Sequence, residues 1–502
     1  MSKHPHTPDP DGLRLPIKID STSNGEFVPV PLNRTNHIAN EAALEAATRN
    51  AQAVNSSRRS FLRSSCGVAS TLLAMNQVHA AAGNLGGYFQ VPAAAAFDPQ
   101  LASASVEGNE FIFDVQGHYV DPRGAWLKQI PEFARPFADM PKADCDLYYE
   151  GDPKSYLNCL GPGEFVKDVF LDSDTDMMVL SFVPSAPDAE PVTIEAAAAT
   201  RQIIEDMEGS KRLLLHGRVN PNQPEDMDRM EELAETWKIS AWKTYTQFGP
   251  DRKGYYLSDD VGLAFIEKAR SLDVKVICIH KGLPLGRDSI EHSRCTDIGV
   301  VAKQYPDMSF IVYHSGYVAG KAEGAYAPDN DGVDTLIRSL LDNGIAPDSN
   351  VYAELGSTWR FLMREPDHAA HVLGKLLKYC GEKNVLWGTD SIWYGSPQDQ
   401  IQAFRTFQIA PELRELHGYP ELTPAVKAGV FGLNATVPYK ISPAEVQLHA
   451  SKSLAGSAAR RDPIGNLQAN YRDNPDPHFS TYGPKTRRQF FNLLARNRGQ
   501  RS

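Results

Sequence analysis

The sequence lacks the cysteine pairs typical of zinc fingers and iron–sulfur clusters. Its 502 residues contain six cysteines, and none belongs to a C-x-x-C pair, so neither kind of centre is expected. The chain also has no G-x-x-x-x-G-K-[ST] phosphate loop, no evident short-period repeat and no apolar run long enough to span a bilayer. A formal net charge of −11 argues against a nucleic-acid binder, because contacts with phosphate need a basic face.

What is present is the composition of a soluble globular protein, with 42% hydrophobic and 23% charged residues. The length allows one large domain or two ordinary ones with a deep core. A disulfide between Cys145 and Cys159 is conceivable if the protein is exported, but the sequence does not decide the pairing.

The composition changes along the chain and suggests five regions. The first is polar, with scattered Pro, Asn and Ser, and is expected to be disordered. The last is rich in Arg, Asn, Ser and Pro, with one candidate short helix around Phe490–Leu494. The regions are a disordered leader (1–56), an export signal (57–82), a linker (83–107), a barrel domain (108–440) and a polar C-terminal extension (441–502).

The export signal is suggested by SRRSFLR at Ser57–Arg63, followed by a weakly apolar stretch and by small residues near Ala82. This order resembles a twin-arginine signal, which implies export of the folded protein by the twin-arginine machinery and a periplasmic or extracellular location. No stable membrane anchoring is expected once such a signal is removed. The alternative is a basic patch that precedes a short buried helix.

Between residues 108 and 440, short apolar strand candidates alternate with helical patterns, as in Val261–Asp273 and Val333–Gly344. Eight such alternations predict an α/β fold of the (β/α)₈ TIM-barrel type. An open doubly wound sheet is less favoured, because no Gly-rich fingerprint follows the first strand. The predicted strands are FIFDVQGH, DMMVLSFV, RLLLHGRV, SAWKTYT, VKVICIH, SFIVYHSG, VYAELG and NVLWGTD.

Several of these strands end in polar residues, and the carboxyl ends of barrel strands meet at one mouth, where the chemistry of such enzymes lies. Three histidines and an aspartate at four strand ends favour a metal site over isolated hydrogen-bonded histidines. The candidates are Gln116 and His118 after strand one, Lys243 on strand four, His280 on strand five, His314 on strand six and Asp390 on strand eight.

These residues resemble the pattern of the amidohydrolase superfamily, in the amidohydrolase-related branch that includes aminocarboxymuconate-semialdehyde decarboxylase. That pattern is Asp-x-His-x-His on strand one, His on strands five and six and Asp on strand eight. The motifs NVLWGTDSIWYG and VFGLNA also match, and the resemblance covers about residues 110–440. The matching residues are Asp114, His118, His280, His314 and Asp390.

The resemblance implies one divalent ion, zinc first and manganese as the alternative, held by Gln116, His118, His280 and Asp390. Gln116 departs from the pattern, because it stands where the family has the first histidine. A neutral amide oxygen binds zinc less well than imidazole, so Gln116 is either a weak ligand or a residue that orients a ligand. A third alternative is a site that has lost its ion.

The resemblance also implies the roles of the remaining candidates. Asp390 and His314 are the catalytic candidates, with His314 alternatively a partner that orients Asp390. Lys243 is expected to contact a substrate anion or to form a salt bridge at the edge of the core. No role is assigned to His216, and Arg360 and Trp393 are candidates for lining the pocket.

We therefore expect a metal-dependent hydrolase that uses a metal-activated water on a small C–N, ester or lactone substrate. The first alternative is a metal-dependent decarboxylase of an unsaturated or aromatic acid, and the second is a barrel that binds a small molecule without turnover. The partner implied is a small-molecule substrate, and homo-oligomer formation is left open.

Overall fold

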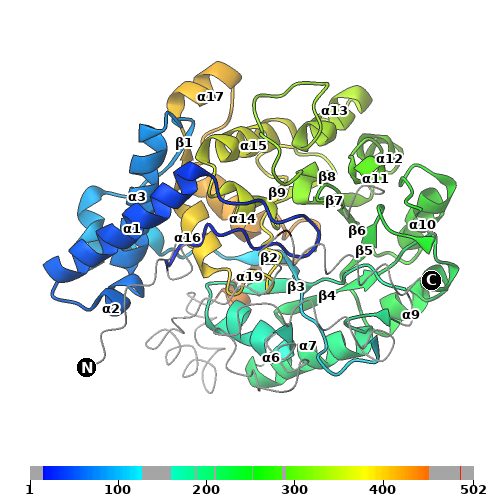
Figure 1. Ribbon diagram of the computed structural model, residues 1–502. Helices are drawn as coiled ribbons and strands as arrows, with labels where there is room; N and C mark the ends of the chain where they lie inside the picture. The colour runs from blue at the N-terminus through cyan, green and yellow to red at the C-terminus, as the bar shows by residue number, and fades with distance from the viewer. Residues whose placement is uncertain are drawn as a thin grey trace.

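The computed structural model describes residues 15–126, 160–186, 189–208, 211–250, 253–284, 290–450 and Arg487. Its centre is a barrel of eight parallel strands in the order of the sequence, drawn in the middle of Figure 1. The first and last strands are joined by the hydrogen bond from Val115 N to Trp387 O (3.0 Å) and by a parallel bridge between Gly117 and Ser391. The strands are β2 (Phe113–Gly117), β3 (Met177–Leu180), β4 (Leu213–Arg218), β5 (Ala241–Tyr245), β6 (Val276–His280), β7 (Ser309–Tyr313), β8 (Val351–Glu354) and β9 (Val385–Leu386).

All eight strands lie within the segments predicted from the sequence, so the predicted barrel is confirmed. The helices that cover the barrel bury one face each, as their spacing predicts. In α13 (Val333–Asn343), the buried Val333, Leu336, Ile337 and Leu340 lie on one side, and Gly344 ends the helix at φ 68°.

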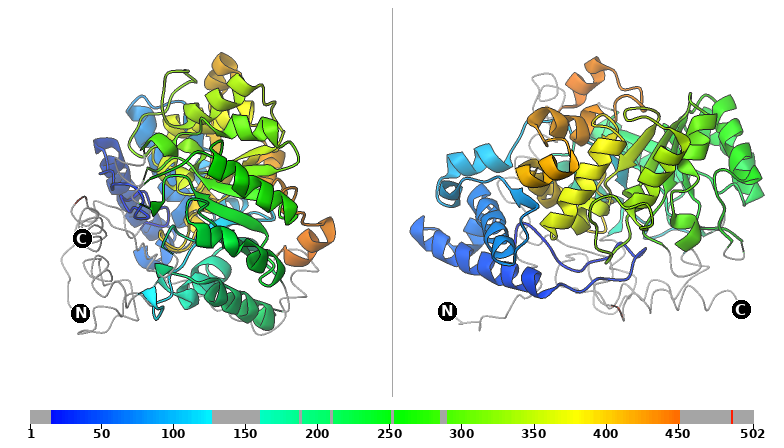
Figure 2. Two further views of the ribbon diagram at one scale, coloured as in Figure 1. Left: turned by 90° about the vertical axis from the view of Figure 1, so that its right-hand side faces the viewer. Right: turned by 90° about the horizontal axis from the view of Figure 1, so that it is seen from above.

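Helices and turns connect the strands and cover the outside of the barrel (Figures 1 and 2). They are α6 (Pro162–Phe165), η5 (Val166–Leu171), α7 (Ile194–Glu208), α8 (Pro224–Asp228), α9 (Met230–Glu235), α10 (Asp260–Ser271), α11 (Ile290–Ser293), α12 (Ile298–Gln304), η9 (His314–Gly316), α13, α14 (Thr358–Leu362), α15 (Pro366–Tyr379), α16 (Gln398–Thr406), α17 (Pro411–His417), α18 (Pro424–Ala428), η10 (Gly429–Leu433) and α19 (Pro443–His449).

An additional layer precedes the barrel, and it corrects the expectation of a disordered leader. From residue 15 the chain is ordered: an extended segment leads into α1 (Arg34–Ala53), drawn in dark blue in Figure 1. The sequence hid this helix because its buried face is made of small and polar side chains rather than a conventional apolar stripe. Those alanines, Ala39, Ala43, Ala47 and Ala51, recur every four residues and are buried.

The predicted export signal forms α2 (Arg58–Leu62) and α3 (Ser65–Ala81), which pack against α1 and α4. Val68, Leu72 and Met75 of α3 also join the main hydrophobic core. The alternative interpretation, a basic patch before a buried helix, therefore describes the local structure, whereas export itself stays a prediction. None of the described helices is both long enough and apolar enough to cross a membrane.

The predicted linker is folded as well. It contains β1 (Gly87–Phe89), η1 (Ala93–Ala96) and α4 (Pro99–Val106), and β1 pairs antiparallel with β10 (Phe407–Ile409) beyond the barrel strands. Part of the C-terminal extension is ordered too, because α19 packs at the barrel end where β2 begins, beside Phe113 and Tyr439. The candidate helix at Phe490–Leu494 and the candidate disulfide Cys145–Cys159 lie outside the described residues.

Candidate metal centre

The predicted site residues converge at the carboxyl ends of the barrel strands. Gln116, His118, His280, His314 and Asp390 all have at most 2% of their surface exposed. His314 and Asp390 have φ angles of 62° and 61°, in the left-handed region that non-glycine residues rarely adopt. Strained backbone of this kind persists where the surrounding structure fixes a side-chain direction, and it is concentrated at functional sites.

The first group of side chains surrounds Asp390. His118 Nε2 lies 3.1 Å from Asp390 Oδ1, and Gln116 donates from Nε2 to the same oxygen at 3.1 Å. Trp393 stacks on the His118 ring at 5.9 Å, which confirms its place beside the site. Gln116 is therefore a donor that orients Asp390 in this arrangement, one of the two roles considered for it, and its ligation of an ion stays a prediction.

The second carboxylate oxygen of Asp390 is also held. Ser357 Oγ donates to Asp390 Oδ2 at 2.5 Å and Asn24 Nδ2 donates to it at 2.6 Å. Burial alone would raise the pKa of Asp390, but the hydrogen bond and charge of His118, the charge of His314 and the Ser357 hydrogen bond hold that pKa well below its usual range. Asp390 is thus an ionised carboxylate with a fixed direction.

The second group contains His280, His314 and Glu26. His280 Nδ1 lies 3.4 Å from Glu26 Oε1, and His314 Nε2 lies 3.7 Å from Glu26 Oε2. Asn24 connects the two groups, because its Nδ2 also donates to Glu26 Oε2 at 2.6 Å. The site is therefore one continuous cluster with two carboxylates and three imidazoles.

The two histidines of this group have one ring nitrogen each directed at a backbone carbonyl. His314 Nδ1 lies 2.7 Å from Gly356 O, and His280 Nε2 lies 3.4 Å from Leu283 O. Because a carbonyl can only accept, these nitrogens carry the proton and the opposite nitrogens carry lone pairs toward Glu26. Burial lowers the pKa of His314 to about 4 and that of His280 well below its usual value, so both rings are neutral at pH 7.

Lone pairs on two imidazoles that face a carboxylate repel one another unless a proton or a cation lies between them. One ligand atom from each of Glu26, His280 and His314 lies within 4.8 Å of the others. Ligands about 2.1 Å from a shared tetrahedral ion would be roughly 3.4 Å apart, close to the two distances above. His280 Nδ1 and His314 Nε2 are buried and have no hydrogen-bond partner in the described part of the chain. The residues therefore fit a divalent cation.

Lys243 lies deeper, on β5, with no exposed surface. Its Nζ lies 3.7 Å from the centre of the Tyr313 ring and 4.7 Å from that of Tyr245. Burial lowers the pKa of Lys243 to about 8. No carboxylate of the described residues forms an ion pair with Nζ, so the salt bridge considered for it is not seen there and the cation is left for an anion.

Two further expectations concern neighbouring residues. His216 lies in the barrel interior, with Nε2 3.3 Å from the Tyr439 hydroxyl, and has no contact with the site. Arg360 holds the N-terminal segment, through Lys18 O at 2.5 Å and Asp20 Oδ1 at 2.6 Å, and its place in a pocket stays a prediction.

Sequence reasoning missed Glu354, Ser357, Asn24 and Glu26. Glu354 ends β8 and accepts from the backbone amides of His314 (3.0 Å) and Gly356 (2.6 Å), and its polar character at a strand end was a usable signal. Asn24 and Glu26 offered no such signal, because they precede the barrel by some 90 residues in a segment without periodicity.

The carboxylate of Asp114 accepts hydrogen bonds from neighbouring parts of the chain instead of joining the cluster of site residues. Its Oδ1 accepts from the backbone amides of Gln116 (3.0 Å) and Thr389 (3.1 Å), and its Oδ2 accepts from the Thr389 hydroxyl. It thereby aligns β2 with the turn that follows β9, which sets the relative positions of Gln116 and Asp390.

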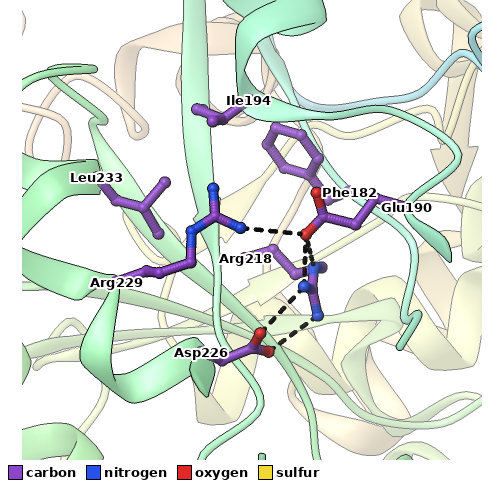
Figure 3. A pocket seen from close by; sticks show the side chains of 7 residues that line it. All are labelled: Phe182, Glu190, Ile194, Arg218, Asp226, Arg229 and Leu233. Atoms are coloured by element: carbon purple, nitrogen blue, oxygen red, sulfur yellow. Dashed lines mark hydrogen bonds and ion pairs between the residues drawn. The ribbon is translucent and has the colours of Figure 1, made fainter. Parts of the chain in front are cut away.

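A separate pocket lies outside the cluster, beside the carboxyl end of β4 (Figure 3). Its central cation, Arg218, contacts Glu190 at 2.5 Å and Asp226 at 2.9 Å. Arg229 also lines the pocket and lies 3.9 Å from Glu190, so the pocket contains two arginines and two carboxylates whose charges offset one another.

Comparison with known proteins yields a family model described as Amidohydrolase, which matches residues 157–441. Among solved structures, an uncharacterized TIM-barrel protein from Bordetella bronchiseptica shares 14% identity over 67% of this chain and 99% of its own, with a TM-score of 0.40. The 5-carboxyvanillate decarboxylase from Sphingomonas paucimobilis shares 16% identity over 66% and 99%, with a TM-score of 0.39. A D-hydantoinase from Bacillus sp. AR9 shares 12% identity over 53% and 51%, with a TM-score of 0.27. The search of curated proteins gave no match.

Proposed function

Because this chain belongs to the amidohydrolase family, a family of metal-dependent enzymes, we propose that it hydrolyses a small C–N, ester or lactone substrate. The observation that carries the proposal is the cluster at the barrel mouth, in which an ionised carboxylate, Asp390, adjoins imidazoles whose lone pairs face inward. The ion is zinc, with manganese as the alternative, since nitrogen and oxygen ligands suit both.

The ion would be held by His280 and His314, whose lone pairs face the same point, with His118 and Asp390 as predicted ligands in the adjoining group. A divalent ion bound there would polarise a substrate carbonyl and lower the pKa of water toward neutrality. Asp390 accepts hydrogen bonds on both oxygens, so it is positioned to take a proton at a fixed place. His314 would thus share the ion through Nε2, and its predicted role in orienting the substrate or passing a proton to the leaving group would follow from that position.

Lys243 supplies the only further charge that the proposal uses, and it suits a substrate with a carboxylate or another anionic group. This cation also supports a second candidate, the non-oxidative decarboxylation of an unsaturated or aromatic acid, since such a substrate brings a carboxylate. Both reactions place the anion near Lys243; they differ in whether water enters the product or carbon dioxide leaves.

The proposal is tested first by the metal content of the purified full chain. We expect about one zinc or manganese ion per chain in the wild type and a loss of most of it in His280→Ala, because that variant removes a ligand. A wild-type protein without bound metal at pH 7 would contradict an enzyme of this kind. If the protein is instead a barrel that binds a small molecule without turnover, no product should form from any substrate that is offered.

The reaction is then identified with panels of small esters, lactones, amides and aromatic acids. Incorporation of ¹⁸O from water into the product supports the hydrolase, whereas carbon dioxide release without ¹⁸O incorporation supports the decarboxylase.

Export through the twin-arginine pathway is a separate proposal, supported by the order of segments around Arg58 and Arg59. Replacement of both by lysine should keep the protein in the cytoplasm, as measured by fractionation. Unchanged distribution of the variant would contradict export by this pathway.

A further inference from the structure

The segment at residues 15–32 crosses the mouth of the barrel before α1 begins (Figure 1). It is held along its length by side chains that follow β8 and β9. Lys18 N donates to Asp399 Oδ2 at 3.1 Å, and Arg360 binds both Lys18 O and Asp20. Phe27 packs edge-on against Phe361 at 5.6 Å. These buried polar and apolar contacts fix the segment in place across the mouth of the barrel.

Within this segment, Ser23 fixes a tight turn that carries Asn24 and Glu26 into the cluster. Ser23 Oγ donates to Phe27 O at 2.5 Å and accepts from Gly25 N at 3.0 Å, and Asn24 Oδ1 accepts from Glu26 N at 2.9 Å. Asn24 Nδ2 then holds one oxygen of Glu26 and one of Asp390, so it sets the direction of both carboxylates.

Glu26 faces two ring nitrogens that the fold has left with lone pairs. His280 is wholly buried and its Nδ1 lies 3.4 Å from Glu26 Oε1, beyond the length of a good hydrogen bond. Strand one, in contrast, offers an amide at Gln116, whose Nε2 is turned to Asp390. Strand one therefore offers no carboxylate to His280 and His314, whereas the segment ahead of the barrel places Glu26 against both.

We propose that Glu26 is a ligand of the catalytic metal ion and supplies the charged ligand that Gln116 cannot, so that residues 15–82 remain part of the working enzyme. The inference rests on the proposed metal-dependent function and adds a ligand from outside the barrel. With Glu26 and Asp390 both bound, two negative charges offset a divalent cation, and the neutral imidazoles complete its coordination.

The proposal bears directly on processing of the chain. Cleavage near Ala82, as the twin-arginine signal would suggest, removes Glu26 and Asn24 from the covalent chain together with α1 and α3. Those helices bury Val68, Leu72 and Met75 in the main core, so cleavage would also expose apolar surface. The mature enzyme is therefore expected to keep α1, α3 and the residues ahead of them, 15–33, which we call the front segment.

The direct test is metal binding by full-length Glu26→Gln, with Glu365→Gln as the matched control. Glu365 also touches the front segment, through Asn33 Nδ2 at 2.9 Å, but lies away from the cluster. Affinity for Zn²⁺ and Mn²⁺ is measured by competition with a chelator, and the visible spectrum of the Co²⁺-loaded protein reports the ligand set. We expect at least a tenfold loss of affinity and a changed spectrum in Glu26→Gln only, with circular dichroism confirming that each variant is folded.

Equal affinity and an unchanged spectrum in Glu26→Gln would overturn the inference while leaving the proposed function intact. A wild-type chain that binds neither ion would overturn the proposed function, and the ligand role with it. Tighter metal binding or faster turnover in Glu26→Gln would instead show that the segment blocks the site, and it would also refute the ligand role. Finally, intact-mass measurement of the metal-loaded protein from its native compartment should show Glu26 in the chain; a fully loaded protein that begins after Ala82 contradicts retention.

Discussion

Lys243 and Lys281 lie on or beside neighbouring barrel strands, and neither has exposed surface. Lys281 Nζ is paired with Asp297 Oδ1 at 2.8 Å, whereas Lys243 has aromatic rings beside it and no acidic partner among the described residues. A buried charge without a partner reduces stability, and a function is the usual reason for keeping it.

We predict opposite effects of the same substitution at these two lysines. Lys243→Met should raise the free energy of unfolding at pH 7 by about 1–3 kcal/mol, because it removes an unpaired buried cation. Lys281→Met should lower it by about 3 kcal/mol, because Asp297 is left buried without a counter-charge among the described residues and keeps only the hydrogen bond from Leu257 N to Oδ2. Denaturant unfolding of both variants gives the comparison.

The pH dependence of the unfolding free energy gives a further prediction for Lys243. The folded pKa of Lys243, about 8, lies below its unfolded value, so the unfolded chain binds more protons between pH 8 and 10.5 and wild-type stability rises relative to Lys243→Met over that range. The loss of Lys243 should also raise KM for an anionic substrate more than it lowers kcat. A destabilised Lys243→Met would show that the amine has a partner after all.

At the scale of single elements, the sequence of α3 allows two interpretations, an export signal and a buried helix. His79 bears on the second: it lies near the end of α3, has 1% of its surface exposed and accepts a hydrogen bond at Nδ1 from Asn84 Nδ2 (3.1 Å). Burial lowers the pKa of His79 to about 4, against the opposing charge of Asp367. Since the unfolded chain binds more protons between pH 4 and 6.5, stability from this residue is lost as the pH falls through that range.

We predict that His79→Gln removes about 2 kcal/mol of the acid destabilisation between pH 7 and pH 4.5. The measurement is the difference between the unfolding free energies of variant and wild type at the two pH values. A constant difference would mean that α3 is not packed as described, as expected for a segment that is cleaved or detached.

The elements also show what the sequence could and could not predict. The eight strands and helices such as α10 and α13 were predictable because apolar residues recur at one period and turn residues bound them. The front segment and α1 were not, since Leu15, Ile17 and Ile19 form only a short alternation in a leader of polar composition and α1 is buried through alanines. At the site, the histidines and Asp390 at strand ends were found from their position, although Glu354 at the end of β8 was missed. Glu26 and Asn24 reach the cluster only through tertiary contacts.

At the scale of the whole molecule, both ends of the barrel are closed by chain from outside it. The mouth is covered by residues 15–32, and the opposite end packs against Tyr439 and α19. If a metal ion joins the mouth to the front segment, its removal loosens a contact between regions far apart in sequence.

We therefore predict that chelation lowers the melting temperature of the full chain. An ion present at 100 times its dissociation constant adds about 2.7 kcal/mol to the folded state, on the order of 3 °C for a chain of 502 residues. Calorimetry with and without chelator measures the shift, and readdition of Zn²⁺ or Mn²⁺ should restore it. A chelated protein with the untreated melting temperature would contradict a buried metal link.

The contact between Lys18 and Asp399 joins positions 381 residues apart. At a synthesis rate of about 5–20 residues per second, roughly 20–80 seconds pass before the second partner emerges from the ribosome. Throughout that interval Ile17 and Ile19 lack their partners in the barrel, whereas the alanine face of α1 can pack on α3 soon after it is made. The earliest residues of the nascent chain are therefore those that wait longest for their docking site.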